Sequence, residues 1–178
     1  SVLSSMAFSL FSPGTTPSSN NVIYVNRFNG KYLLGTPQGY WTFDPETGRT
    51  LSFEPLRQII GEYEIMSYCV DKGDNLWIGT RGGGLYLREP SGRVSLFYRN
   101  GNTSEDNVID VAADDRHLWL GTLNGVVILN REGKGERFRA RYDNYNGLPH
   151  NSISQIFRKG DGTAVIAMIA DRLYTRDP

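Results

Sequence analysis

The chain has 178 residues, of which 39% are hydrophobic, and its 19 lysines and arginines balance 19 aspartates and glutamates. This length and composition suffice for a buried core and argue against a disordered chain. Zero net charge removes the electrostatic attraction expected of a nucleic-acid binder or of a protein held on an anionic membrane, so we expect no nucleic-acid partner. The apolar runs fall short of the roughly 20 residues that span a bilayer, so we expect no membrane segment.

A short motif recurs along the chain. It reads Leu-Trp-(Ile or Leu)-Gly-Thr, followed by a glycine and an apolar pair, and it occurs at residues 76–86 and 118–127. A third copy lies at residues 33–41 and a degraded fourth copy at residues 164–174. The Gly-Thr positions of the four copies are 44, 42 and 46 residues apart, so the chain repeats with a period of a little over forty residues.

Each repeat contains four short stretches of strand character separated by turn residues, which we name A to D in chain order. We expect a lone D strand at about residues 6–11, followed by blades at about residues 22–53, 65–97, 108–138 and 153–178. Four antiparallel strands in a repeat of this length are typical of a β-propeller blade. The sequence therefore predicts an all-β fold with almost no helix, in which residues 1–178 form a single β-propeller domain or segment of four blades.

The fourth repeat ends after its C strand, and the lone first strand could supply the missing D strand. A ring of four blades could close by that exchange. Alternatively, the chain is a slice of a larger propeller, which is the arrangement we favour, and an apolar blade face is then open at each end. We expect such a slice to associate with itself, two copies completing an eight-bladed ring, or with the remaining blades of a parent chain.

Several recurring residues have structural explanations. Trp77 and Trp119 occupy the same repeat position and are expected to pack between blades. In each Gly-Thr pair, we expect glycine to let the B strand end tightly and threonine to bond a neighbouring backbone group. Cys69 is expected to be a buried, inert thiol, and the isolated His117 and His150 give no zinc or catalytic signature, so no cofactor, metal or catalytic residue is predicted. The aspartates expected to shape A-to-B hairpins, and not to bind calcium, are Asp71, Asp74, Asp114, Asp115 and Asp161.

Residues 75–86, Asn-Leu-Trp-Ile-Gly-Thr-Arg-Gly-Gly-Gly-Leu-Tyr, and residues 146–153, Asn-Gly-Leu-Pro-His-Asn-Ser-Ile, resemble the two-component regulator propeller repeat. The fourth repeat departs from the pattern, with Val165 in place of tryptophan and Ala167-Met168 in place of Gly-Thr. Repeats of this family build the extracytoplasmic sensor regions of hybrid two-component histidine kinases, especially in Bacteroidetes. The resemblance implies a periplasmic, non-catalytic sensor segment whose kinase lies elsewhere in a parent chain. It also implies an oligosaccharide released from a complex glycan, or another small ligand, as the signal.

The alternating direction of the strands places the B-to-C and D-to-A connections on one face of the propeller. Binding groups concentrate on loops that a rigid scaffold holds in place. Amide, guanidinium and aromatic groups on this face are the combination that a sugar or sugar acid would use. The candidate ligand-binding residues are Gln38, Arg81, Asn124 and Asp171 near the axis, with Tyr142, Tyr145 and Tyr63 around them.

Two other classes of function stay open on the sequence. A scaffold for protein–protein assembly or receptor dimerisation would present large apolar surfaces at the blade ends and a bland loop face. A propeller lyase or glycosidase would need two converging acids, or a histidine and a carboxylate, on one face. The B-to-C connections supply only Asp171, which disfavours the enzyme.

Overall fold

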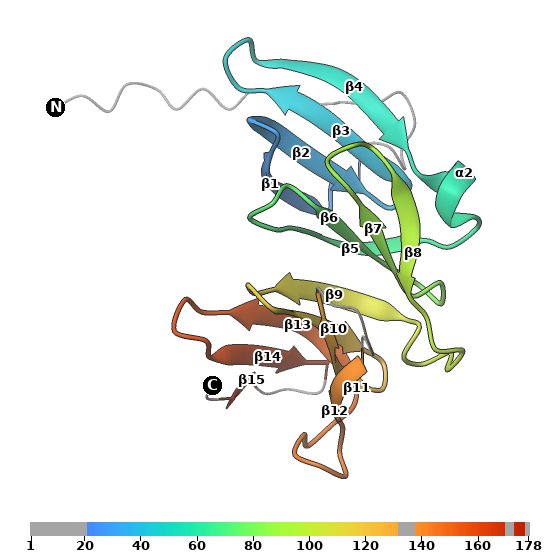
Figure 1. The fold of residues 1–178 in the computed structure, drawn as a ribbon, viewed down its shortest axis with the longest axis vertical. Helices are drawn as coiled ribbons and strands as arrows, with labels where there is room; N and C mark the ends of the chain where they lie inside the picture. Colours follow the sequence, from blue (N-terminus) through green and yellow to red (C-terminus); the bar gives the residue numbers. More distant parts are fainter. Residues whose placement is uncertain (1–20, 132–137, 170–172, 177–178) are drawn as a thin grey trace, which may run out of the picture.

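A computed structural model describes residues 21–131, 138–169 and 173–176. These residues form four antiparallel sheets that follow one another along the chain, with one four-residue helix after the first sheet (Figure 1). The elements are β1 Tyr24–Phe28, β2 Lys31–Thr36, β3 Gly39–Asp44, β4 Arg49–Pro55, α2 Arg57–Ile60, β5 Ile65–Val70, β6 Leu76–Thr80, β7 Leu85–Arg88, β8 Val94–Tyr98, β9 Val108–Ala113, β10 His117–Thr122, β11 Gly125–Asn130, β12 Phe138–Tyr142, β13 Ile153–Arg158, β14 Ala164–Met168 and β15 Leu173–Arg176. The predicted all-β fold is confirmed.

Each sheet is a meander in which every strand pairs with its neighbour in the chain, the topology of a propeller blade. The first three sheets have four strands, in the orders β1-β2-β3-β4, β5-β6-β7-β8 and β9-β10-β11-β12. The fourth sheet has the strands β13, β14 and β15 within the part of the chain that the structure describes. The lone D strand predicted at residues 6–11 lies outside the described residues.

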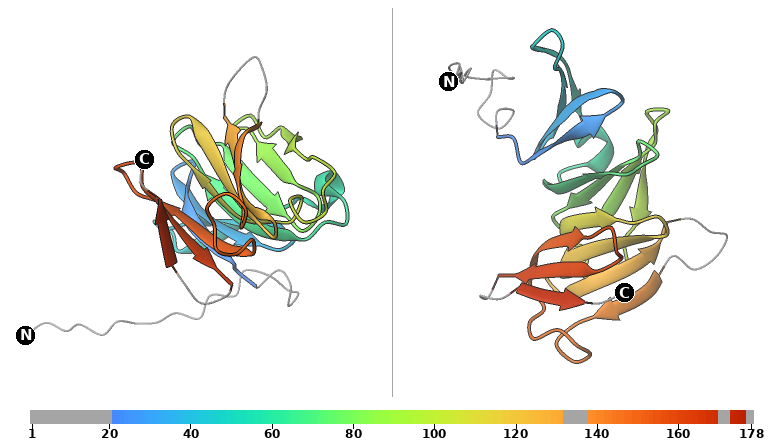
Figure 2. Two further views of the ribbon diagram at one scale, coloured as in Figure 1. Left: turned by 90° about the horizontal axis from the view of Figure 1, so that it is seen from below. Right: turned by 90° about the vertical axis from the view of Figure 1, so that its left-hand side faces the viewer.

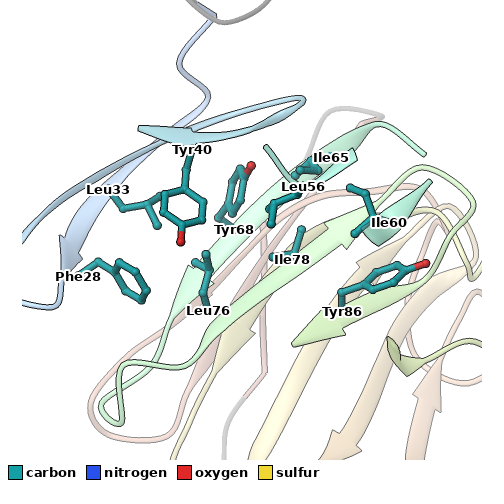
Figure 3. Packing of buried hydrophobic residues seen from close by; sticks show 10 residues of the cluster. All are labelled: Phe28, Leu33, Tyr40, Leu56, Ile60, Ile65, Tyr68, Leu76, Ile78 and Tyr86. Atoms are coloured by element: carbon teal, nitrogen blue, oxygen red, sulfur yellow. The ribbon is translucent and has the colours of Figure 1, made fainter. Parts of the chain in front are cut away.

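The blades pack on one another through their A strands. Strands β5 and β9, and likewise β9 and β13, lie side by side across the blade junctions. The first three sheets follow one another along the long axis of the molecule, and the fourth lies beside the third (Figures 1 and 2). At the first junction, Phe28 and Tyr40 of the first blade pack with Tyr68 and Leu76 of the second (Figure 3). A core is thus built at each junction, and no single blade contains one by itself.

The repeated tryptophans belong to the next two junctions. Trp77 is 2% exposed and lies in a cluster with side chains of β9 and β10, whereas Trp119 is 8% exposed and lies in a cluster with side chains of β13 and β14. Both indoles are therefore buried between successive blades, which confirms their predicted structural role.

The repeated threonines close the B-to-C turns. Thr36, Thr80 and Thr122 are fully buried, and each hydroxyl donates a hydrogen bond of 2.8–2.9 Å to the carbonyl of the glycine that opens the C strand. These glycines, Gly39, Gly84 and Gly125, have positive φ, which other residues adopt only with strain. A β-carbon at Gly125 would also lie 2.1 Å from the carbonyl oxygen of Tyr142. The expected backbone bond of the threonine is confirmed.

The glycine of each Gly-Thr pair has a different role from the one we expected. Gly35, Gly79 and Gly121 lie within strands and have no positive φ, so a tight strand end is not what requires them. A β-carbon at Gly79 would lie 2.8 Å from Val108, the first residue of β9 in the next blade. At Gly121 it would lie 2.6 Å from Ile153 of the fourth blade. The absence of a side chain at these glycines leaves space for the A strand of the next blade.

Candidate functional site

The connections between strands form two opposite faces. The BC/DA face consists of residues 37–38, 56–64, 81–84, 99–107, 123–124, 143–152 and 169. The AB/CD face consists of residues 29–30, 45–48, 71–75, 89–93, 114–116, 131 and 159–163. All the described candidate binding residues lie on the first face or at the strand ends that border it.

The BC/DA face contains a hollow of about 340 Å³ between the first and second blades. The loop that forms its wall is anchored by Leu56 and Ile60, which are buried in the junction core, and by a hydrogen bond from the Leu56 amide to the Gln38 carbonyl. This anchoring leaves the polar side chains of Gln38, Arg57 and Glu64 at the hollow. A short helix, α2, therefore serves to hold the loop in place.

Three candidate residues meet at this hollow. Gln38 and Tyr63 line it, and Arg81 reaches its rim because its Nε donates a 2.8 Å hydrogen bond to Glu64, which also lines it. The Tyr63 ring packs against Gly83, where a β-carbon would lie 2.6 Å from the ring. The Arg99 guanidinium lies 5.2 Å from the centre of the same ring. The ring is thus held in a fixed position, and the structure brings together residues from the B-to-C and D-to-A connections as predicted.

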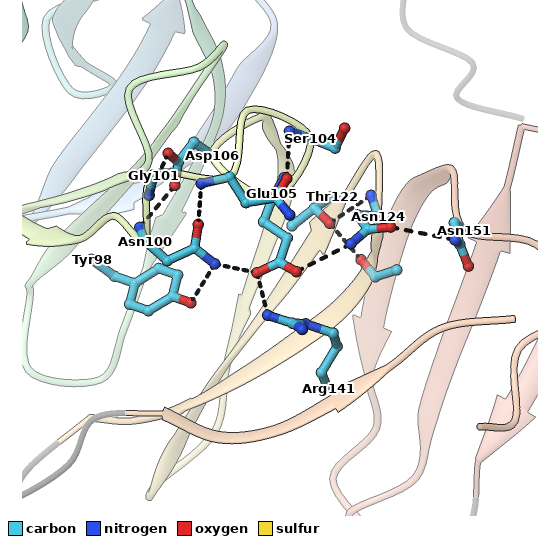
Figure 4. Close-up of polar contacts among 12 residues, drawn as sticks. Tyr98, Asn100, Gly101, Ser104, Glu105, Asp106, Thr122, Asn124, Arg141 and Asn151 are labelled. Carbon is cyan, nitrogen blue, oxygen red and sulfur yellow. Dashed lines mark hydrogen bonds and ion pairs between the residues drawn. The ribbon is translucent and has the colours of Figure 1, made fainter. Parts of the chain in front are cut away.

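A second feature of the BC/DA face is a buried carboxylate, that of Glu105 (Figure 4). One of its oxygens accepts a hydrogen bond of 3.1 Å from the Asn124 amide, and the other accepts one of 2.7 Å from Arg141 and one from Asn100. The Asn124 carbonyl in turn accepts a bond of 3.4 Å from Asn151. The amide of Asn124, a candidate for ligand contact, is thus engaged at both ends in an internal network.

The remaining candidates lie apart from the hollow. Tyr142 ends β12 and packs against the core between the third and fourth blades, and Tyr145 is 90% exposed in the following loop. Neither of them lines the hollow that Gln38 borders. Asp171 lies outside the described residues.

The AB/CD face carries a recurring set of hydrogen-bonded aspartate, tryptophan and arginine side chains, which we call a latch. The sequence predicts only the role of the aspartate in its turn. The Asp71 carboxylate accepts hydrogen bonds from the Gly73 and Asn75 amides of its own turn, as predicted for a hairpin aspartate, and one of 2.9 Å from the Trp77 indole. Across the blade junction, Arg131 donates a bond of 2.6 Å to the same carboxylate. Burial alone would raise the pKa of Asp71, but the bonds from Trp77 and Asn75 outweigh it, so the pKa is lowered.

The latch is repeated one blade further along. Asp114 accepts a bond of 3.0 Å from the Trp119 indole and one of 3.2 Å from Arg158 of the fourth blade. The Arg158 guanidinium also lies 4.3 Å from the centre of the Trp119 ring. Burial acts to raise the pKa of Asp114, but hydrogen bonds from the backbone of Arg116 and from Trp119 lower it. Each tryptophan, aspartate and arginine set joins two blades.

Beside these latches lies a second hollow, of about 470 Å³, on the AB/CD face. It is lined mainly by the A-to-B connections of three blades, at residues 71–72, 114–117, 159–160 and 162. We predicted no site on this face. A signal was present in the sequence, because every A-to-B connection carries a basic residue in the turn or at its end: Lys31, Lys72, Arg116 and Lys159.

Two further observations concern the described residues as a whole. None of their helices is long and apolar enough to cross a membrane. Among the same residues, no three histidine, cysteine, aspartate or glutamate side chains gather closely enough to hold a metal ion.

The similarity of this chain to known proteins is found in the fold and not in the sequence. The sequence matches no family model and no curated protein. The structure is similar to the extracellular domain of a protein described as a hybrid two component system, BT3049 from B. thetaiotaomicron, with a TM-score of 0.73 and 20% identity over 95% of this chain and 22% of that one. It is also similar to the extracellular domain of BT4673 from the same organism, described as a one component system, with a TM-score of 0.61 and 21% identity over 84% of this chain and 20% of that one.

A streptogramin B lyase structure is similar as well, with a TM-score of 0.65 and 12% identity over 94% of this chain and 57% of that one. The chain therefore spans about a fifth of the length of the two B. thetaiotaomicron domains. Sequence identities this low show a shared architecture but not a shared activity. The chain is a set of consecutive β-propeller blades similar to those of extracellular domains of bacterial two-component systems.

Proposed function

We propose that this chain is a propeller segment of an extracytoplasmic sensor domain, located in the periplasm as part of a two-component receptor. In this proposal the chain binds a small ligand on its BC/DA face and catalyses no reaction. Support comes from two similar structures, one described as the extracellular domain of a hybrid two component system and the other as that of a one component system. Their low identity means that the ligand site has to be argued from the residues of this chain.

The observation that carries the proposal is the hollow beside Gln38. Its volume of about 340 Å³ falls within the range of roughly 300–1,000 Å³ typical of small-molecule sites. Its lining combines the amide of Gln38, the carboxylates of Glu62 and Glu64 and the guanidinium of Arg57. Sugar hydroxyls donate and accept hydrogen bonds, so an uncharged oligosaccharide end suits a wall that alternates acceptors and donors.

The residues around the hollow are held before a ligand arrives. Arg57 pairs with Glu62, and Arg81 pairs with Glu64 at 2.8 Å, while the loop itself is anchored in the junction core. Such pre-organisation lowers the entropy cost of binding. Because the wall comes from the first blade and from the connection to the second, a bound ligand would contact the segment that joins two blades, which is a route from binding to a change in blade packing.

Isothermal titration calorimetry with a panel of neutral oligosaccharides tests this proposal. One member of the panel should bind saturably, and Gln38→Ala and Arg81→Ala should each weaken its binding by about tenfold, the loss expected for a hydrogen-bonding group at a desolvated contact. Arg49→Ala, which removes an exposed charge at the start of β4 away from the hollow, is the matched control and should bind as the parent does. Equal affinity of all four proteins for the bound sugar would contradict the site.

A second function, that of an assembly scaffold, is favoured by one observation. Apolar side chains are exposed on the A strands of the first and fourth blades, with Val25 58% exposed and Phe157 64% exposed. The corresponding strands of the inner blades, β5 and β9, are covered on both sides by neighbouring blades. These surfaces suit contact with further blades or with a second copy. Light scattering over a dilution series tests self-association, and a monomer at every concentration would contradict it.

A further inference from the structure

The hollow on the AB/CD face gathers positive charge, although the chain as a whole is neutral. Five basic side chains and three carboxylates line it, which leaves an excess of two positive charges. The basic residues are Lys72, Arg116, Arg131, Arg158 and Lys159, and the carboxylates are those of Asp71, Asp114 and Asp115. A concave surface focuses the field of such a charge excess and attracts small anions.

The carboxylates are largely engaged inside the protein. The Asp71 side chain is 1% exposed, and its oxygens accept bonds from Trp77, Asn75 and Arg131. The Asp114 side chain accepts bonds from the Trp119 indole and from two amides of its turn. Because these acceptors are occupied, the two carboxylates offer an incoming ligand little to bind and serve instead to hold the arginines in place.

The cations have donor capacity left. A guanidinium has five N–H donors, and Arg131 uses one on each terminal nitrogen, in bonds to the Asp71 carboxylate and to the Asp114 carbonyl, which leaves a second N–H on each of these two nitrogens. Arg158 donates one bond to the Asp114 carboxylate through a terminal nitrogen, which likewise keeps a second N–H. At the rim, Arg116 and Lys159 are exposed and form no ion pair with another described residue. The hollow thus offers two hydrogen-bonded guanidinium groups in its wall and two exposed cations at its edge.

We propose that this hollow binds a small oxyanion with two negative charges, a phosphate or sulfate group, either free or as an ester. The two charges match the excess of two in the lining, and planar guanidinium groups and ammonium groups suit oxyanions of this kind. The volume of about 470 Å³ exceeds that of a bare ion and leaves room for an attached group of sugar size. Since the lining comes from three successive blades, the anion would join them at one point.

The two histidines of the chain provide the test. His117 lines the hollow, whereas His150 lies in an exposed loop on the opposite face. In proton NMR at constant ionic strength and pH, titration with inorganic phosphate should move the imidazole signals of His117 along a saturable curve and leave those of His150 in place. Sulfate should do the same, and chloride should not. Signals of His117 that do not move with either dianion, or that move together with those of His150, would overturn the proposal.

A variant that lacks two of the positive charges provides a second test of phosphate binding. Arg116→Gln with Lys159→Gln should weaken phosphate binding by about tenfold, since two charges next to the anion are lost. Arg93→Gln removes an exposed charge from a C-to-D turn of the same face outside the hollow and should bind phosphate as the parent does. An unchanged affinity in the double variant would overturn the site. Glucose 6-phosphate and glucose 6-sulfate distinguish the two sources, because tighter binding than that of the inorganic ions identifies an ester and equal binding identifies the free ion.

Discussion

Replacing Gly79 by alanine would place a methyl group inside the junction between the second and third blades. The new carbon would lie 2.4 Å from Ser67 Oγ, 2.8 Å from Val108 Cγ1 and 2.8 Å from the Val108 carbonyl oxygen. The serine hydroxyl can rotate away, but the carbonyl belongs to the backbone of β9, so the third blade has to move. Overpacking of this kind costs about 1–3 kcal/mol. For a domain of this size each kcal/mol lowers Tm by about 2–4 °C.

The assay is thermal unfolding followed by circular dichroism, with urea unfolding as a second probe. Gly160→Ala is the matched control, because this glycine has no positive φ and no atom within 4 Å of the added carbon. Gly160→Ala should unfold as the parent does, whereas Gly79→Ala should unfold at a lower temperature. Equal stability of the two variants would refute the conclusion that Gly79 is required to make space for the next blade.

Three further predictions concern side chains that the fold removes wholly or partly from solvent. Thr122→Val removes the bond from the fully buried hydroxyl to the Gly125 carbonyl and should cost about 1–3 kcal/mol in urea unfolding, and an unchanged midpoint would contradict the role of the threonine. The pKa values of Asp71 and Asp114 are lowered in the folded chain, so the stability they contribute is complete above their ordinary value of 3.8 and is lost as the pH falls through the lower folded-state value. Urea midpoints measured from pH 7 to pH 2 should therefore fall in acid, and less steeply in Asp71→Asn; identical slopes would contradict this. Burial raises the pKa of Cys69 to about 12, so a thiol reagent at pH 8 should label it only after urea is added, and rapid labelling of the native chain would be the contrary result.

The fold is predictable from the sequence because the residues that recur in each repeat are those that the backbone geometry of the turns requires. The Gly-Thr pairs and the glycine that opens each C strand recur at the same place in successive repeats, and the period together with four strand-like stretches in each repeat indicates four-stranded blades. The reason for the motif glycine was not predictable, since Gly79 is required by Val108, a residue of another blade. A contact between blades leaves no trace in the spacing of a single repeat.

The candidate site was predictable in part. The alternation of strand direction correctly grouped Gln38, Tyr63 and Arg81 on one face. It could not show that the Asn124 amide is engaged by Glu105, because the D-to-A loop that carries this carboxylate differs in sequence from the D-to-A loops of the other repeats.

The latches between blades were missed for a similar reason. Arg131 follows a C strand and Arg158 ends an A strand, so the two arginines occupy different positions in the repeat although they perform the same task. The aspartates and tryptophans that they join recur at fixed positions and were visible in the sequence. Only the three-dimensional arrangement shows that the arginines complete these sets and that a basic hollow lies beside them.

The central claim is that the BC/DA face recognises a ligand through the hollow beside Gln38. Calorimetric titration of the parent chain and of Gln38→Ala with the same neutral oligosaccharide tests it most directly. The parent chain should bind saturably and the variant should bind about tenfold more weakly, at an unchanged melting temperature because the Gln38 side chain is exposed. Binding of equal strength by both proteins, or no binding of any sugar in the panel, would contradict it.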